Sequence, residues 1–177
     1  MTSSIYPPVV VVDENDHEIG TAMLDEVLHK GLYHRIVAIF VIYDRGHMLL
    51  QLRGPNVKLY PNCWDQAAGG HVDAGQTYQQ AAANELTEEL GLHKLNLTTM
   101  GTHRTNTQDG PHVINQFERV YQATIPHDTV LKPQLSELTG LRWFTPAELK
   151  QLIAQQLSAL TPGLLYDLRH YFPTFSQ

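Results

Sequence analysis

The order of apolar and polar residues along the chain predicts several strands. A long apolar run rich in β-branched residues at 34–44 predicts a buried strand, and a turn leads from it into a second strand at 47–53. Residues 9–22 predict a hairpin, because two extended runs flank a turn rich in Asp and Asn. Further extended segments are expected at 66–72, 95–105, 112–125 and 140–145.

Helix signals stand between these strands. Residues 77–90 predict a helix with Thr77 as its N-cap and Gly91 as its stop. Other helices are expected before Gly31 and after Pro146 and Pro162. Helices interspersed among strands and long hairpins favour an α/β fold of the α+β type, with a mixed sheet, over a doubly wound sheet.

Composition narrows the class of protein. The chain has 177 residues, of which 42% are hydrophobic, so one domain with a real core is expected. A net charge of -6 provides no basic stripe for a nucleic-acid duplex, and no stretch approaches the ~20 apolar residues of a membrane span. The single cysteine, Cys63, cannot form an internal disulfide, and the N-terminus lacks the signal-peptide pattern, so a reducing cytoplasm is expected.

The chain is expected to form one domain with an N-terminal extension. Residues 1–33 would form the hairpin and a short helix, which pack on a main domain at 34–177. The two C-terminal helices offer a surface for a homodimer, and such an interaction role is compatible with an enzymatic one.

Three glutamates crowd one face of the helix at 77–90. Glu85, Glu88 and Glu89 stand at i, i+3 and i+4, where like charges destabilise a helix by a few tenths of a kcal/mol per pair. Residues 78–92 contain no Lys or Arg to relieve them. A solvated face is the ordinary meaning of such a cluster. A bound Mg²⁺ is the alternative, because carboxylate oxygens suit this hard cation and Mg²⁺ so held acts on phosphate groups.

The neighbourhood of these glutamates resembles the Nudix box, G-x5-E-x7-R-E-U-x-E-E-x-G-U with U aliphatic. The matching positions are Gly70, Glu85, Leu86, Glu88, Glu89, Gly91 and Leu92. The flanking segments "LLQLR" and "ELTGLRWFTPAEL" extend the resemblance over about residues 34–150. The resemblance implies a Nudix-like α/β/α sandwich with a mixed sheet, preceded here by the N-terminal β-hairpin extension.

The resemblance also implies a site. In that family the glutamates matching Glu85, Glu88 and Glu89 bind Mg²⁺ or Mn²⁺, helped by a backbone carbonyl at the position of Gly69. The metals polarise a diphosphate, and an activated water attacks one phosphorus. Glu137 matches a glutamate that many members use as a ligand or base, so Glu85 and Glu137 are the candidate catalytic residues. No substrate-binding residue is assigned.

Two positions of the box depart from the family pattern. The glutamate after x5 is Gln76 here, and the arginine is Asn84. Both are neutral amides that can still form a hydrogen bond, so we expect their side chains to interact and to fix the loop at Gly69 and Gly70. A decayed box is the alternative, and it would leave a protein that only binds its ligand.

The segments "VVDENDHEIGTAMLDEVLHKGLYHRIVAIFVI" and "CWDQAAGGHV" resemble isopentenyl-diphosphate isomerases, a branch of the same superfamily. His34 and His71 occupy two of the histidine positions of those enzymes. The isomerases also need a cysteine just before the Gly-His pair and glutamates on a later strand. Those positions hold Gly69, Ile114 and Gln116 here, none of which can transfer a proton, so isomerase activity is not expected.

One further carboxylate lies near these positions in the sequence. Glu118 stands two residues after Gln116, on the same strand face. It offers the site a fourth carboxylate, and a surface glutamate paired with Arg119 is the alternative. His103 and Arg104 could contact a base or a phosphate, although packing or surface roles are more common for such residues.

The patterns and the resemblance together predict a divalent-metal-dependent hydrolase. Its partner would be a small-molecule diphosphate, and it would cleave a diphosphate linkage in a small organic or nucleoside diphosphate derivative. The alternative is a non-catalytic Nudix-fold module that binds or senses a phosphorylated ligand. The sequence does not identify the substrate, because specificity in such folds lies in loops.

Overall fold

A mixed β-sheet forms the centre of the computed structural model, which describes residues 7–43, 46–134 and 138–176. Its strands are β1 (Val9–Val12), β2 (Glu18–Ala22), β3 (Tyr33–Tyr43), β4 (His47–Arg53), β5 (Trp64–Gln66), β6 (Ala68–His71), β7 (Thr98–Asp109), β8 (His112–Ile125) and β9 (Leu138–Phe144). β3 lies at the centre and pairs with β8 in parallel and with β1, β4 and β6 antiparallel. The sheet is therefore mixed, as expected.

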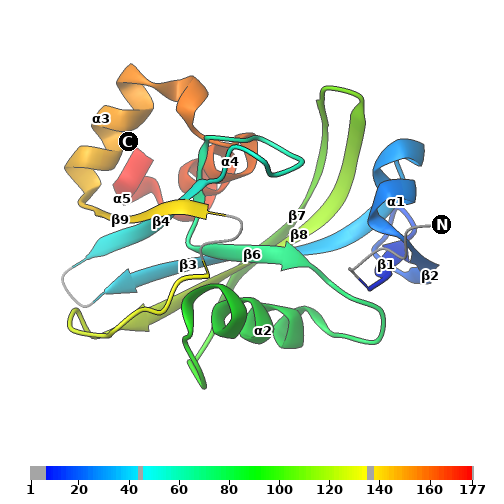
Figure 1. Cartoon of the computed structure of the whole chain (residues 1–177), viewed down its shortest axis with the longest axis horizontal. Coiled ribbons are helices and arrows are strands. Elements are labelled where there is room, and N and C mark those ends of the chain that lie inside the picture. The colour runs from blue at the N-terminus through cyan, green and yellow to red at the C-terminus, as the bar shows by residue number, and fades with distance from the viewer. Residues whose placement is uncertain (1–6, 44–45, 135–137, 177) are drawn as a thin grey trace.

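Helices cover both faces of this sheet (Figure 1). They are α1 (Leu24–Lys30), α2 (Tyr78–Leu90), α3 (Pro146–Gln155), α4 (Pro162–Tyr171) and α5 (Pro173–Ser176), with a 3-10 turn at Leu157–Ala159. α2 lies on one face, and α3, α4 and α5 gather on the other. This arrangement confirms the predicted α/β/α sandwich. None of the described helices is long and apolar enough to cross a membrane.

The two apolar layers explain the unbroken apolar run of β3. Successive side chains of a strand point to opposite faces. Val37 and Ile39 accordingly belong to the core beneath α2, whereas Ala38 and Phe40 belong to the core beneath α4. A strand covered on both sides needs apolar residues at every position, which is why its sequence shows no alternation.

The acidic helix α2 begins and ends at the predicted residues. The Thr77 hydroxyl accepts from the Gln80 backbone N–H, and the Gln80 side chain accepts from the Thr77 backbone N–H, which completes a capping box. Gly91 closes the helix in the left-handed conformation. An N-cap of this kind contributes about 1 kcal/mol to helix stability, so the position of α2 is fixed locally before packing adds to it.

The N-terminal hairpin is part of the central sheet. All four valines of β1 are buried, and β1 pairs with β2 and, at Val11, with His34 of β3. β1 also holds the segment that follows β6, because the Val10 backbone N–H donates to the Val72 carbonyl at 3.0 Å. The Ala74 backbone N–H donates to the Pro8 carbonyl in the same way. The division of the chain at residue 33 stays a prediction.

Some boundaries differ from the expected ones. The extended segment expected at 66–72 begins earlier, because Trp64 starts β5 by pairing with Leu52 of β4. β7 runs over Thr98–Asp109 rather than 95–105, since its full length finds a partner in β8. In the turn between them Gly110 adopts a φ of 55°.

Candidate active site

The side chain of Glu85 packs directly against the backbone of β6. A Cβ atom added at Gly70 would lie 2.5 Å from Glu85 Cδ and closer still to its Oε1 atom. Gly70 has no positive φ, so its small size rather than its backbone freedom explains its presence. The absence of a side chain at Gly70 opens the space that the Glu85 carboxylate fills, so α2 packs closely against β6 at this point.

Glu89, one turn further along α2, is held by the preceding residue of β6. The Gly69 backbone N–H donates to Glu89 Oε2 at 3.2 Å. Glu85 and Glu89 are both half-buried, whereas Glu88 is exposed. The structure thus brings Gly69, Glu85 and Glu89 together, while Glu88 points to the solvent side of the same cluster.

A fourth carboxylate, Asp73, lies near Glu88. Burial, followed by the negative charge of Glu88, raises the pKa of Asp73 above its ordinary value. The sequence argument did not identify this residue. The available signal was its place in the segment between the Gly-Gly pair and the N-cap of α2.

The donor set of this cluster fits the divalent cation that the resemblance implies. All its side-chain donors are carboxylate oxygens, which suit Mg²⁺ and Mn²⁺. Neither end of α2 carries a basic residue that would neutralise them. The cradle at Gly70 keeps one of the carboxylates beside the backbone of β6. The individual roles of Gly69, Glu85, Glu88 and Glu89 stay predictions.

Glu137, the second candidate catalytic residue, lies outside the described residues. The described chain that leads toward it is attached to the C-terminal turn of α2. The Lys132 backbone N–H donates to the Leu90 carbonyl at 2.9 Å, and that of Gln134 to the Glu89 carbonyl at 3.0 Å. The segment before Glu137 is therefore anchored on the same helix that carries the glutamates.

The expected interaction between Gln76 and Asn84 is wrong. Gln76 Nε2 instead approaches Asp73 Oδ2 at 3.5 Å, and Asn84 is exposed. No hydrogen bond joins the two amides, both of which lie in the described part of the chain. The Asp73 carboxylate, three residues before Gln76, is the nearer partner for its amide. The loop is held instead by its backbone hydrogen bonds to β1.

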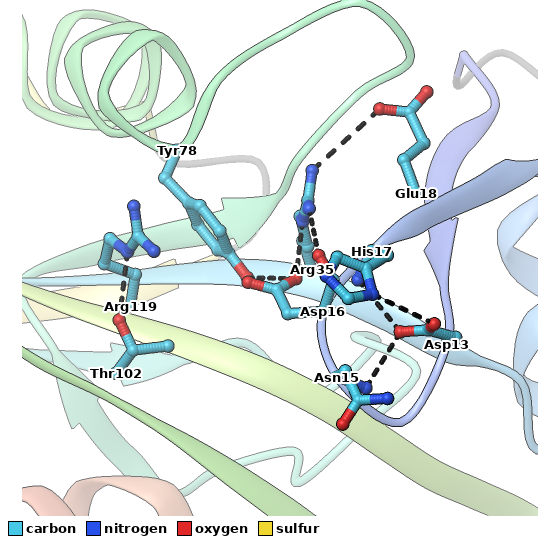
Figure 2. A network of polar contacts seen from close by, with 9 residues as sticks. All are labelled: Asp13, Asn15, Asp16, His17, Glu18, Arg35, Tyr78, Thr102 and Arg119. Atoms are coloured by element: carbon cyan, nitrogen blue, oxygen red, sulfur yellow. Dashed lines mark hydrogen bonds and ion pairs between the residues drawn. The ribbon is translucent and has the colours of Figure 1, made fainter.

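A cavity of about 660 Å³ opens beside the N-terminal end of α2. Its lining consists of Asp16, Glu18, Arg35, Gly75, Gln76, Thr77, Tyr78, Gln79, Thr99, Arg119 and Tyr121. Figure 2 shows the polar network on this side of the sheet. Arg35 is held by the Asp16 carboxylate at 2.6 Å, and the Tyr78 hydroxyl donates to the same carboxylate at 3.1 Å.

Arg119 is the second arginine of this cavity. Its guanidinium lies 4.0 Å from the centre of the Tyr78 ring, and its Nε donates to the Thr102 hydroxyl at 3.0 Å. No carboxylate of the described residues lies within ion-pair distance of it. Arg119 therefore retains a positive charge that is available to an anionic ligand in the cavity.

The two histidines that match isomerase positions lie together on the sheet face opposite α2. The rings of His34 and His71 stack with their centres 5.2 Å apart. Burial lowers the pKa of His34 to about 4. Burial, and then the charge of His34, lowers the pKa of His71 to about 3. Both rings are neutral at pH 7, and His34 Nδ1 donates to the Leu32 carbonyl at 3.3 Å.

Glu118 does not join the carboxylates of α2, nor is it a surface residue paired with Arg119. Its side chain is 2% exposed, on the face of the sheet that α4 covers. His103, from the adjacent position of β7, lies beside it. The sequence left two roles open, a fourth carboxylate of the site and a surface glutamate paired with Arg119, but the packing of α4 buries Glu118 on the other face.

These features together define a class of protein: an α/β/α sandwich whose acidic helix packs against a glycine turn of the sheet. The NUDIX domain matches residues 32–163, about three quarters of the chain. The chain therefore belongs to the NUDIX domain family.

Relatives and solved structures agree with this assignment. An isopentenyl-diphosphate Delta-isomerase from Nocardia farcinica is 32% identical over 161 residues, which cover 89% of this chain and 90% of that protein. An uncharacterized Nudix hydrolase from Nostoc sp. is 30% identical over 144 residues, covering 78% and 80%. DR0079 from Deinococcus radiodurans, 24% identical, has the same fold, with a TM-score of 0.75 over 93% of this chain and 99% of that one. Because the relatives include both an isomerase and a hydrolase, membership alone does not choose the reaction.

Proposed function

We propose that this protein is a divalent-metal-dependent hydrolase that cleaves a diphosphate linkage in a small organic or nucleoside diphosphate derivative. The observation that carries the proposal is the arrangement of three glutamates on one face of α2, with Glu85 against Gly70 and Glu89 bonded to Gly69. Like charges so placed cost stability unless a cation is bound between them. Glu85, Glu88 and Glu89 would hold that cation, together with the Gly69 carbonyl.

Different residues of the chain would have different roles in hydrolysis. A bound Mg²⁺ supplies charge neutralisation of the diphosphate and polarises its phosphorus. Glu85 or Glu137 would accept a proton from the attacking water, whose oxygen forms the new bond to phosphorus as the bridging P–O bond breaks. Gly69 and Gly70 let the backbone of β6 lie close to the carboxylates, because neither residue places a side chain in that space.

The cavity beside α2 supports the proposal with a place for an anionic substrate. Arg119 contributes a positive charge, and Tyr78 contributes an aromatic surface. Gln76 lines the cavity and also approaches Asp73. Burial, and then the negative charge of Glu88, raises the pKa of Asp73. Gln76 therefore belongs both to the cavity lining and to the surroundings of Asp73.

Two positions support hydrolysis over isomerisation. A Cβ atom at Gly69, where the isomerases carry their cysteine, would lie 2.7 Å from the Val37 carbonyl oxygen and 2.8 Å from Gln66 Nε2. The neighbouring backbone would have to move to admit a cysteine. Gln116 pairs with His34 across the sheet and offers an amide where an acid would be needed. Purified protein should form no allylic isomer from isopentenyl diphosphate, and measurable isomer would refute this part of the proposal.

Phosphate release from a panel of diphosphates, measured while Mg²⁺ is titrated, tests the hydrolase. We expect turnover that requires Mg²⁺ and that falls in Glu85→Gln and Glu89→Gln. Glu26→Gln is the matched control, because Glu26 is exposed on α1 and forms only an ion pair with Lys30. Equal turnover in all variants would contradict the assigned roles.

A non-catalytic binding or sensing module is the second candidate. Gln76 and Asn84 favour it, because both stand where the family carries charged residues and neither replaces their pairing. Such a module would bind a phosphorylated ligand and protect the protein against thermal unfolding, yet release no phosphate in the same panel.

A further inference from the structure

A second group of metal-ligand side chains lies on the opposite face of the sheet from α2. His103 of β7, Glu118 of β8 and Asp167 of α4 converge there. One ligand atom from each lies within 4.8 Å of the others. The hydrolase proposal uses none of these residues, and α4 supplies one of them from a distant part of the sequence.

Burial makes this group costly without a partner. The side chains of His103, Glu118 and Asp167 are 7%, 2% and 0% exposed. Four of their polar atoms are buried without a hydrogen-bond partner: His103 Nε2, Glu118 Oε2, Asp167 Oδ1 and Asp167 Oδ2. A buried polar atom left unpaired destabilises a protein by about 1–3 kcal/mol, and more when it is charged. Two carboxylates and an imidazole buried together need a cation or a shared proton between them.

The distances match coordination better than hydrogen bonding. His103 Nε2 lies 3.5 Å from Glu118 Oε2 and 3.7 Å from Asp167 Oδ1. Good hydrogen bonds between such groups are ~2.7–3.2 Å long. Two ligand atoms each about 2.1 Å from a tetrahedral Zn²⁺ lie roughly 3.4 Å apart.

The surroundings of His103 fix the ring in the orientation of a ligand. It stacks on Tyr166 with ring centres 4.2 Å apart. Its other nitrogen, Nδ1, faces the Tyr171 hydroxyl at 3.4 Å. Tyr171 can come this close because Gly101 leaves room for its ring. A ligating histidine commonly donates its second N–H to such an oxygen, which leaves Nε2 with a free lone pair.

The charges nearby do not neutralise Glu118 and Asp167. Arg53 is paired with Asp65 at 3.0 Å. Asp65 also accepts from the Thr161 hydroxyl at 2.7 Å. Burial, and then the charge of Asp65, raises the pKa of Glu118 to about 8, and burial with the charge of Glu118 raises the pKa of Asp167 well above its ordinary value. A divalent cation would balance the two carboxylates, and a neutral imidazole would add no charge.

We propose that His103, Glu118 and Asp167 form a second, buried metal site that takes a divalent transition metal, Zn²⁺ above Mg²⁺. The imidazole nitrogen selects against Mg²⁺, which takes oxygen ligands, and in favour of Zn²⁺. The site joins α4 to β7 and β8, so its role is to fix the C-terminal helices on the sheet. It is independent of the carboxylates of α2 and of the proposed hydrolysis.

Zn²⁺ binding to a variant without the acidic helix cluster tests the proposal. Glu85→Gln, Glu88→Gln and Glu89→Gln are combined, so that α2 cannot hold the ion. The metal content of this protein as purified, and Zn²⁺ titration after chelation in excess Mg²⁺, should each give one equivalent. Co²⁺ in place of Zn²⁺ should give the visible absorption of a four-coordinate site with a nitrogen ligand.

Asp167→Asn and His103→Gln in the same background should weaken Zn²⁺ binding by more than about 100-fold. Asp128→Asn, an exposed loop aspartate, is the matched control and should leave binding unchanged. If Asp167→Asn does not fold, the stoichiometry of the parent variant still decides. No bound Zn²⁺ in that parent would overturn the site, and would point instead to a proton shared between Glu118 and Asp167. Unchanged affinity in a folded Asp167→Asn would also overturn it.

Discussion

The carboxylate of Glu85 occupies the space in front of Gly70 where any other residue would place its Cβ atom, only 2.5 Å from Glu85 Cδ. The obstacle is the far end of a flexible side chain, so an added methyl group would displace Glu85 rather than the backbone. The lack of a side chain at Gly70 of β6 therefore determines where one carboxylate of α2 lies.

Gly70→Ala should lower turnover by about 10²-fold with little loss of stability, because a small displacement of a positioning group is enough to slow catalysis. The measurement is phosphate release beside thermal unfolding. Gly140→Ala is the matched control, since a Cβ at Gly140 meets nothing within 4 Å. Normal turnover in Gly70→Ala would show that Glu85 does not need its present position.

Glu88→Gln should raise the free energy of unfolding of the metal-free protein by a few tenths of a kcal/mol, because it relieves like-charge repulsion with Glu85. The same change should reduce the stabilisation that Mg²⁺ confers. Urea unfolding with and without Mg²⁺ measures both effects. Glu26→Gln should do the reverse in the metal-free protein, since it breaks an exposed ion pair with Lys30. A Glu88→Gln protein that Mg²⁺ stabilises as strongly as the wild type would exclude Glu88 as a ligand.

Glu137→Gln distinguishes two possible roles of Glu137, that of the general base and that of a metal ligand. If Glu137 accepts the proton of the attacking water, turnover should fall by about 10²–10⁴-fold while Mg²⁺ affinity is retained. Glu85→Gln should lower both quantities, because Glu85 is expected to bind the metal. Calorimetric Mg²⁺ titration beside the phosphate assay distinguishes the cases, and full turnover in Glu137→Gln would leave Glu85 as the remaining candidate base.

The stacked histidines should make stability depend on pH. Their folded pKa values, about 4 for His34 and about 3 for His71, lie below the ordinary 6.5. Only the unfolded chain then binds protons just below pH 6.5, so the free energy of unfolding should fall as the pH drops from 6.5 toward 4. Each histidine contributes about 1.4 kcal/mol per pH unit in that window.

Urea unfolding at several pH values between 7 and 5 tests this dependence. His34→Gln should lose less stability per pH unit than the wild type. The substitution removes one of the two groups that bind a proton only in the unfolded chain. His93→Gln, an exposed substitution, should follow the wild type. Parallel curves for wild type and His34→Gln would mean that the buried ring does not govern the loss.

Local chemistry explains why much of the fold follows from the sequence. Thr77 and Gly91 bound α2 through interactions within the helix itself, and Pro146 stands at the first position of α3. The spacing of Glu85 and Glu89 needs only the period of the helix to place both on one face. Such features depend on residues only a few positions apart, so they can be predicted from the sequence alone.

Contacts between distant segments explain what the sequence did not show. The burial of Glu118 was not predicted, because nothing near it in sequence indicates that α4 covers it. Its neighbour Asp167 comes from almost fifty residues further on. Gln76 found its partner in Asp73 rather than in Asn84, because the backbone of the turn sets the direction of its side chain. The family pattern suggested the pairing, and the turn overrides it.

Val72 and Ala74 form backbone hydrogen bonds with Val10 of β1 and with Pro8 just before it. These bonds limit where the chain can be truncated for expression. A recombinant fragment starting at residue 34 would retain the whole Nudix box and the C-terminal helices α3, α4 and α5. It would nevertheless lose the backbone partners of the segment between β6 and α2, and with Asp16 the carboxylate that holds Arg35 and Tyr78. Expression boundaries chosen from the box alone would remove the support of the turn that carries it, so the first strands belong in any minimal catalytic unit.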